Sequence, residues 1–181
     1  MDALTPVLRL HQHRCWVNSK LIATCGHLTD EQLKQHFPIG QGSVWRTLLH
    51  LMGAEYIWLE TLLGNENPVF PGDLPDQLVG NQLAEGGMTT MEELQTRWKT
   101  LDDRWDEYLS GLNADDLPQD IYKVSTSSHF GQRRPTSLMD VLLHVCTHAH
   151  YTTAQLINML RHLGVKELLD PMLITLARSE D

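Results

Sequence analysis

Four of the chain's ten histidines lie between Ser137 and Leu163, in the segment SLMDVLLHVCTHAHYTTAQLINMLRHL. Two of them, His144 and His148, are four residues apart. On an α-helix such residues lie one turn above each other, with Cβ atoms about 6 Å apart. Two imidazoles at this spacing can bind one metal ion, as in the zinc-protease helix motif, although no Glu follows His144 directly and the protease signature is therefore absent. The pair needs at least one further ligand from elsewhere in the chain.

A candidate for that ligand is His50, in the apolar segment LLHLMGAEYIW. Gly53 and Ala54 follow it by one turn, and small residues there would let a neighbouring helix or a ligand come close. A lone histidine on such a helix is more often a hydrogen-bonded core residue than a ligand. Combined with the spaced pair on another helix, it predicts a metal site formed by His50, His144 and His148.

Three histidines define the chemistry that such a site could perform. Three neutral imidazoles, with a fourth position left to water, are typical of catalytic rather than structural zinc sites. A metal held in this way acts as a Lewis acid and lowers the pKa of a bound water or thiol. Nitrogen ligands suit zinc, nickel or iron(II), and the sequence does not select among them.

The hydrophobic pattern predicts the helices that must position these histidines. Two shorter helices are also expected, the first of them started by a capping box and the last interrupted by Pro171. The segment Asn65–Gly87 is rich in proline and glycine and is expected to be a long crossover, a lid or a mobile connection. Near Tyr122 the chain could be extended, as one arm of a small hairpin ending near His129 and Phe130. The expected long helices cover about Leu4–Cys25, Ser43–Gly64, Thr90–Leu109 and Ser137–Leu163, and the short ones about Thr29–His36 and Lys166–Ala177.

These elements predict an all-α protein, a four-helix bundle with a long crossover loop and a short terminal helix. At 181 residues the chain is most simply one domain over residues 1–181, and its 41% hydrophobic content is ordinary for a globular protein. A formal net charge of −9 argues against nucleic acid as a partner. No run approaches the ~20 apolar residues that span a bilayer, so no membrane partner is expected. Three cysteines without a CxxC pair suggest free thiols and a cytoplasmic location.

Several other polar residues have a functional and a structural interpretation. Glu55 could accept a hydrogen bond from an imidazole and orient it, but a charge on the helix surface is the simpler interpretation. Cys146 lies two residues from each histidine of the pair, so it points to the opposite side of the helix and is expected to be a packed thiol. His150 is expected at the surface or in an interface. His11 and His13 are weak candidates for ligands.

Several segments resemble the DinB/YfiT-like family of four-helix-bundle metalloenzymes. The weaker matches are Trp16-Val17-Asn18 and Leu28-Thr29, and the more specific ones are LLHLMGAEYIWL around His50 and LLHVCTHAHYTTAQL around His148. The resemblance covers most of the chain in order. It implies an up-down-down-up bundle, commonly dimeric, so a homodimer is expected. It also implies a metal held by one histidine of the second long helix and two of the histidine-rich helix.

Carried over by position, the resemblance makes His50 the first ligand and His148 the second. The family's third ligand usually falls one turn after the position of His148, in a segment ending His-Arg-Gly-Gln. This chain has Thr152 there, in the segment TTAQ. Either the site uses His144, one turn earlier, or it has lost a ligand, in which case the metal could be absent.

The resemblance supports more than one function. A divalent-metal-dependent enzyme is the first hypothesis. Relatives in the wider superfamily that are thiol-dependent S-transferases suggest that the metal activates a small thiol against an electrophilic substrate. A metal-dependent hydrolase would use the same ligands with water as the nucleophile. The alternative from another class is a non-catalytic bundle whose degenerate site serves packing or dimerisation.

Overall fold

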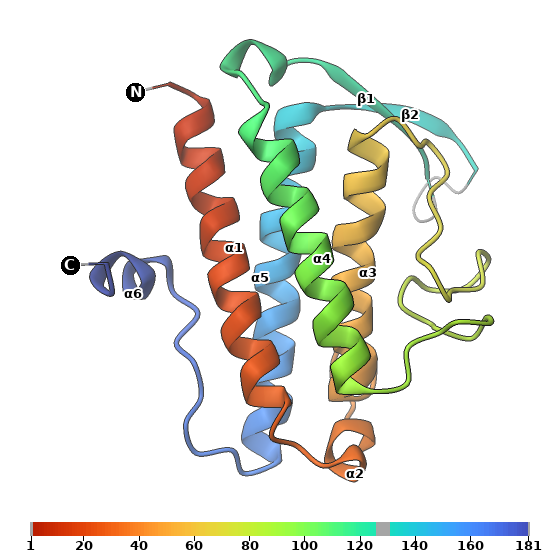
Figure 1. Cartoon of the computed structure of the whole chain (residues 1–181), viewed down its shortest axis with the longest axis vertical. Coiled ribbons are helices and arrows are strands. Elements are labelled where there is room, and N and C mark those ends of the chain that lie inside the picture. The colour runs from red at the N-terminus through yellow and green to blue at the C-terminus, as the bar shows by residue number, and fades with distance from the viewer. Residues whose placement is uncertain (1, 126–130, 181) are drawn as a thin grey trace.

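A computed structural model of the chain describes residues 2–125 and 131–180. Four long helices pack side by side, and a small hairpin crosses one end of them (Figure 1). The predicted four-helix bundle is therefore confirmed. The long helices are α1 (Leu4–Cys25), α3 (Val44–Leu62), α4 (Met91–Ser110) and α5 (Leu138–His162), and the short elements are α2 (Asp30–Lys34), the 3₁₀ turn η1 (Ala114–Asp116), β1 (Asp120–Val124), β2 (Arg133–Ser137) and α6 (Leu173–Arg178).

The order of helix directions follows from the long connection between α3 and α4. In Figure 1, α1 runs down the bundle, α3 and α4 both run up, and α5 runs down. The segment 63–90 makes this possible, because it returns from the upper end of α3 to the lower end of α4 along the outside. This is the up-down-down-up order that the resemblance implied.

Side-chain caps start these helices where the sequence predicts. The Ser43 hydroxyl accepts a hydrogen bond from the Arg46 N–H at 3.2 Å and begins α3. Thr90 and Glu93 form a reciprocal capping box at the start of α4, and Thr29 and Gln32 form another at the start of α2. Each cap satisfies backbone N–H groups that the first helical turn leaves without partners.

The core is built from one apolar face of each long helix. On α4, Leu94, Trp98, Leu101 and Trp105 recur at three- and four-residue spacing and are almost fully buried. Burying one large apolar side chain contributes roughly 1.5–3 kcal/mol. Within the described ranges, no helix is both long and apolar enough to cross a membrane.

A two-stranded antiparallel hairpin lies between η1 and α5. Its register pairs Asp120 with Ser137 and Val124 with Arg133. The small hairpin was predicted with one arm near Tyr122, but the sequence did not locate its second arm, β2, which contains Pro135. A strand with only one neighbour tolerates a proline that has no ladder bond to donate. The predicted turn residues His129 and Phe130 lie outside the described residues.

The helix predicted over Lys166–Ala177 is wrong in its first half. Helix α6 begins at Leu173, two residues after Pro171. Proline lacks an N–H and disfavours helical geometry at the residue before it, so the helix begins only after it. The Pro171 carbonyl instead accepts a hydrogen bond from His13 Nε2 at 2.9 Å, which fixes the C-terminal segment to α1.

Glu55 has a role that neither sequence interpretation foresaw. Its side chain is 1% exposed, and it accepts hydrogen bonds from Arg14 Nη1 and, at 2.8 Å, from Asn18 Nδ2. Both partners belong to α1, so this buried ion pair joins α1 to α3. The predicted packed thiol of Cys146 is confirmed, and burial raises the pKa of that thiol to about 12.

His11 makes the stability of the bundle sensitive to acid. The buried imidazole donates from Nε2 to the Leu142 carbonyl at 3.1 Å, and burial and then the charge of Arg14 lower its pKa from 6.5 to about 3. The unfolded chain therefore binds the proton more readily, and the stability falls as the pH drops below about 6.5. Between pH 8 and pH 5 this proton uptake costs about 2 kcal/mol of stability. We expect His11→Gln, which cannot titrate, to lack that loss in urea denaturation. The exposed His162→Gln is the control, and an unchanged pH profile for His11→Gln would contradict the assignment.

Candidate metal centre and cleft

His50 lies on α3 with its ring held by the long loop. Its Nδ1 is 3.0 Å from the Val79 carbonyl oxygen. A carbonyl only accepts hydrogen bonds, so Nδ1 carries the proton and Nε2 presents a lone pair when the ring is neutral. This is the arrangement common in metal-binding histidines, whose other ring nitrogen donates to a carbonyl or carboxylate.

The loop reaches His50 because glycines allow its backbone to lie against α3. A Cβ on Gly80 would lie 2.5 Å from the backbone nitrogen of His50, and one on Gly53 would lie 2.6 Å from a methyl of Val79. Gly80 also has a φ of +85°, which disfavours other residues. The buried Asp73 accepts bonds from the N–H groups of Gly80 and Gln82 at 2.6 and 2.8 Å and fixes this turn. The element that approaches Gly53 is therefore the loop.

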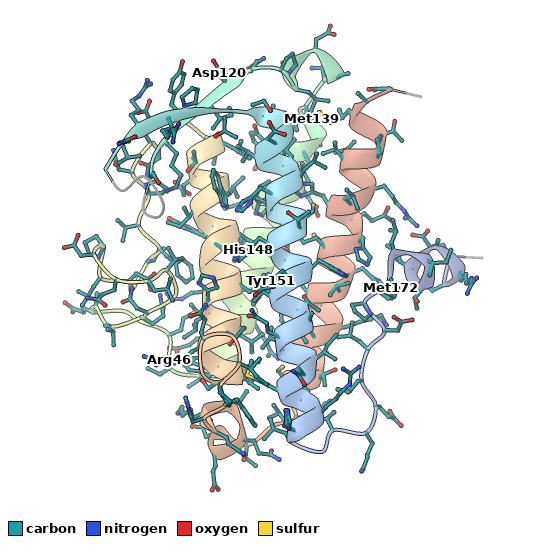
Figure 2. The ribbon with its side chains drawn as sticks, turned by 180° about the vertical axis from the view of Figure 1, so that it is seen from behind. Arg46, Asp120, Met139, His148, Tyr151 and Met172 are labelled. Carbon is teal, nitrogen blue, oxygen red and sulfur yellow. The ribbon has the colours of Figure 1, made fainter. Side chains whose placement is uncertain are left out.

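His148 faces His50 across the contact between α3 and α5. Figure 2 shows it at mid-height of the bundle, on the flank of α5 toward α3. Its Nε2 lies 3.3 Å from the Nε2 of His50. Two nitrogens bound to one tetrahedral metal at 2.0–2.1 Å would be roughly 3.3–3.4 Å apart. The two rings therefore already have the separation of two ligands on one ion.

The protonation state of His148 suits metal binding. Burial, and then the nearby His50 and His144, lower the pKa of His148 from 6.5 to about 4. Burial also lowers the pKa of His144. His148 is therefore neutral at pH 7, as an imidazole must be to bind a metal.

His144 is less well placed than the sequence spacing suggests. The residue is partly open to solvent, and its ring packs edge-on against Trp58, with centroids 5.2 Å apart. The ring centroid is 6.0 Å from that of His148. Among residues 2–125 and 131–180, no three histidine, cysteine or acidic side chains lie close enough to hold one ion. Thr152, at the position where the resemblance implied a further histidine, is buried one turn after His148. The structure thus places two of the three predicted ligands together.

A cleft of about 290 Å³ opens beside the three histidines. Its walls come from α3, α5, the loop and the hairpin, and they include Trp58 on α3 and Lys123 on β1. The sequence indicated a long loop that could act as a lid but gave no sign of which residues it would cover. Trp58 and Lys123 were therefore missed. His150 lies on another side of α5, where its ring is exposed and 6.4 Å from that of His13.

A model of the DinB family matches residues 4–177. This chain belongs to the DinB family. Two solved structures share the fold of this DinB-family chain. YfiT from Bacillus subtilis, described as a probable metal-dependent hydrolase with an unusual four-helix bundle topology, matches with a TM-score of 0.65 and 20% identity over 88% of this chain and 89% of that chain. A DinB-like protein from Bacillus cereus matches with a TM-score of 0.60 and 19% identity over 90% of this chain and 95% of its own. No protein matched in a comparison with curated proteins.

Proposed function

We propose that this DinB-family chain is a metal-dependent enzyme in which His50 and His148 hold a divalent ion at the side of the cleft. The observation that carries the proposal is the 3.3 Å separation of the two Nε2 atoms, with His50 oriented by Val79. The description of YfiT as a probable metal-dependent hydrolase supports it. His144 is the residue in position to approach the same ion after a rotation of its ring away from Trp58.

The chain's own residues define what such a site can do. A bound divalent ion would supply a Lewis acid beside an apolar wall. Val79 keeps the proton of His50 on Nδ1, so Nε2, which faces His148, carries a lone pair. Trp58, Ile57 and Phe70 line the cleft with apolar surface, and electrostatic interactions are stronger beside apolar surface than in bulk water.

Hydrolysis is the reaction class that we propose first, with thiol transfer as the second. The thiols of the half-buried Cys15 and the buried Cys25 and Cys146 are poor nucleophiles, because loss of hydration raises the pKa of each to about 12. None of the three thiols lines the cleft. A thiol nucleophile would therefore have to come from a second substrate, whereas hydrolysis needs only water.

Metal binding tests the proposal directly. We expect zinc or nickel, titrated into chelator-treated protein in a calorimeter, to bind at about one ion per chain. His50→Ala should weaken binding about tenfold or more, because it removes a nitrogen ligand. His150→Ala, on another side of α5, is the matched control and should bind as the native chain does. A native chain that no added metal can load would contradict the proposal.

The second candidate is a non-catalytic bundle whose degenerate site serves packing. Two observations favour it, the threonine at position 152 and the contact of His144 with Trp58. Two results together would identify a non-catalytic bundle: the native chain binds no metal, and His50→Ala unfolds more easily than the native chain. The His50 ring would then serve only to join α3 to the loop. The expected homodimer stays a prediction.

A further inference from the structure

Lys123 is a half-buried cation in the wall of the cleft. It lies on β1, and its ammonium is 5.8 Å from the centre of the Trp58 ring. Its one hydrogen bond within the described residues is to the Val124 carbonyl, at 3.1 Å. No carboxylate of the described chain forms an ion pair with it, although the net charge of the chain is −9.

Acidic residues on the neighbouring elements are bound elsewhere. Glu66 pairs with Arg133 at 2.6 Å. Glu60, on α3, pairs with Arg104 at 2.5 Å. Asp73 also lines the cleft, but its carboxylate accepts three bonds from its own loop, one from Gly80 and two from Gln82.

Burial removes part of the hydration of the Lys123 ammonium, and no ion pair in the described residues replaces it. Loss of water around it lowers the pKa of Lys123. An anion within hydrogen-bonding distance would favour the charged form and replace the lost hydration. The charged end of the lysine therefore gives the cleft a preference for negatively charged ligands.

The remainder of the cleft is suited to an apolar group. Ile57 and Trp58 of α3 and Pro68, Phe70 and Leu78 of the loop contribute apolar surface. A volume of about 290 Å³ is at the small end of the range for ligand sites. In the metal-free cleft the charge of Lys123 balances one negative charge, so a carboxylate fits there better than a phosphate dianion.

We propose that the cleft binds a small amphipathic monoanion, with its carboxylate on Lys123 and its apolar part against Trp58 and the loop. As a statement about the substrate class, this rests on the proposed function. The binding itself needs only the cleft and the lysine, so it can be measured without metal.

Three probes that share a phenyl group on a three-carbon chain, and whose terminal groups are negative, neutral and positive, test the inference on chelator-treated protein: 3-phenylpropionate, 3-phenylpropan-1-ol and 3-phenylpropylammonium. Calorimetry or chemical-shift titration at low salt should show that the carboxylate binds about tenfold more tightly than the alcohol, and the ammonium most weakly. Lys123→Met should bring the carboxylate to the affinity of the alcohol and leave the alcohol unchanged. Lys123→Arg should retain the preference.

Lys20 supplies a matched control. It also lies over a tryptophan, with its ammonium 5.1 Å from the centre of the Trp16 ring, but it is exposed on α1 and does not line the cleft. Lys20→Met removes the same charge from the chain and should leave all three affinities unchanged. An equal loss in both variants would mean that net charge, rather than Lys123, sets the preference, and would overturn the inference.

The outcomes also separate this inference from the proposed function. Equal affinities for the three probes, no binding at millimolar concentration, or a carboxylate affinity unchanged by Lys123→Met would overturn the inference. Carboxylate binding that appears only after zinc is added and ignores Lys123→Met would overturn it while supporting the metal site. Charge selectivity in a chain that never binds metal would support the inference and contradict the proposed function.

Discussion

Glu55→Ala is expected to lower the free energy of unfolding by about 3–5 kcal/mol. The substitution leaves the Arg14 guanidinium without its main counterion. The Arg14 side chain is only 1% exposed, so water cannot take the place of Glu55. It also removes the acceptor of the Asn18 amide. Removing one partner of a buried ion pair lowers the stability strongly, because the other charge stays buried without compensation. Replacing both partners by apolar residues changes the stability much less. Urea denaturation at pH 7 measures the change.

Two variants show whether the loss comes from the uncompensated charge. Glu60→Ala removes the carboxylate of the more exposed pair with Arg104 and should cost about 1 kcal/mol or less. The double variant Arg14→Met with Glu55→Met should recover much of the lost stability, because it leaves no buried charge. A loss below 1 kcal/mol for Glu55→Ala would contradict the prediction and would indicate that Asp102, 3.9 Å from the same Arg14 nitrogen, can replace Glu55.

Thr152→His is expected to raise the affinity for zinc or nickel roughly 100-fold or more. Thr152 lies one turn after His148, so a histidine there would be on the same face of α5. With His50 and His148 it would complete the ligand set that the family resemblance implies. Zinc titration of the native and variant chains, in competition with a chelator of known affinity, measures the gain.

The neighbouring Thr153 provides the control for this substitution. It is also buried, but it lines a separate small cavity with Arg14 and Asn18 between α1 and α5. Thr153→His therefore adds a buried imidazole of the same size away from His148 and should leave the metal affinity unchanged. A native chain that already binds as tightly as Thr152→His would contradict the prediction and would assign the third position to His144.

The sequence predicted local structure well because its signals are local. Ser43 and Thr90 act on N–H groups three residues away, so the starts of α3 and α4 could be identified directly. His148 was predicted from its place in a helical segment and in the family pattern, and the structure places it beside His50. His144 was predicted from its spacing to His148, and spacing does not reveal that Trp58, from another helix, packs against its ring. Its part in the site stays a prediction.

The features that the sequence did not reveal depend on contacts between distant segments. Glu55 could not be assigned to Arg14 because their helices are joined only through the fold, and each residue alone resembles a surface charge. The contact between Val79 and His50 depends on the path of a loop without periodicity. Lys123 was missed for the same reason, since only the position of the hairpin over the bundle brings β1 to the cleft.

The hydrogen bond from His50 to Val79 has a consequence for the behaviour of the long loop. One imidazole is bonded to the loop through Nδ1 and faces the cleft through Nε2. Suppose that a ligand binds Nε2 more tightly when the loop lies against α3 with Val79 in place. Thermodynamic reciprocity then requires that the bound ligand shift the equilibrium between the docked and undocked loop toward the docked state by the same factor. Occupancy of the cleft and order in the long loop between α3 and α4 are therefore coupled through a single ring.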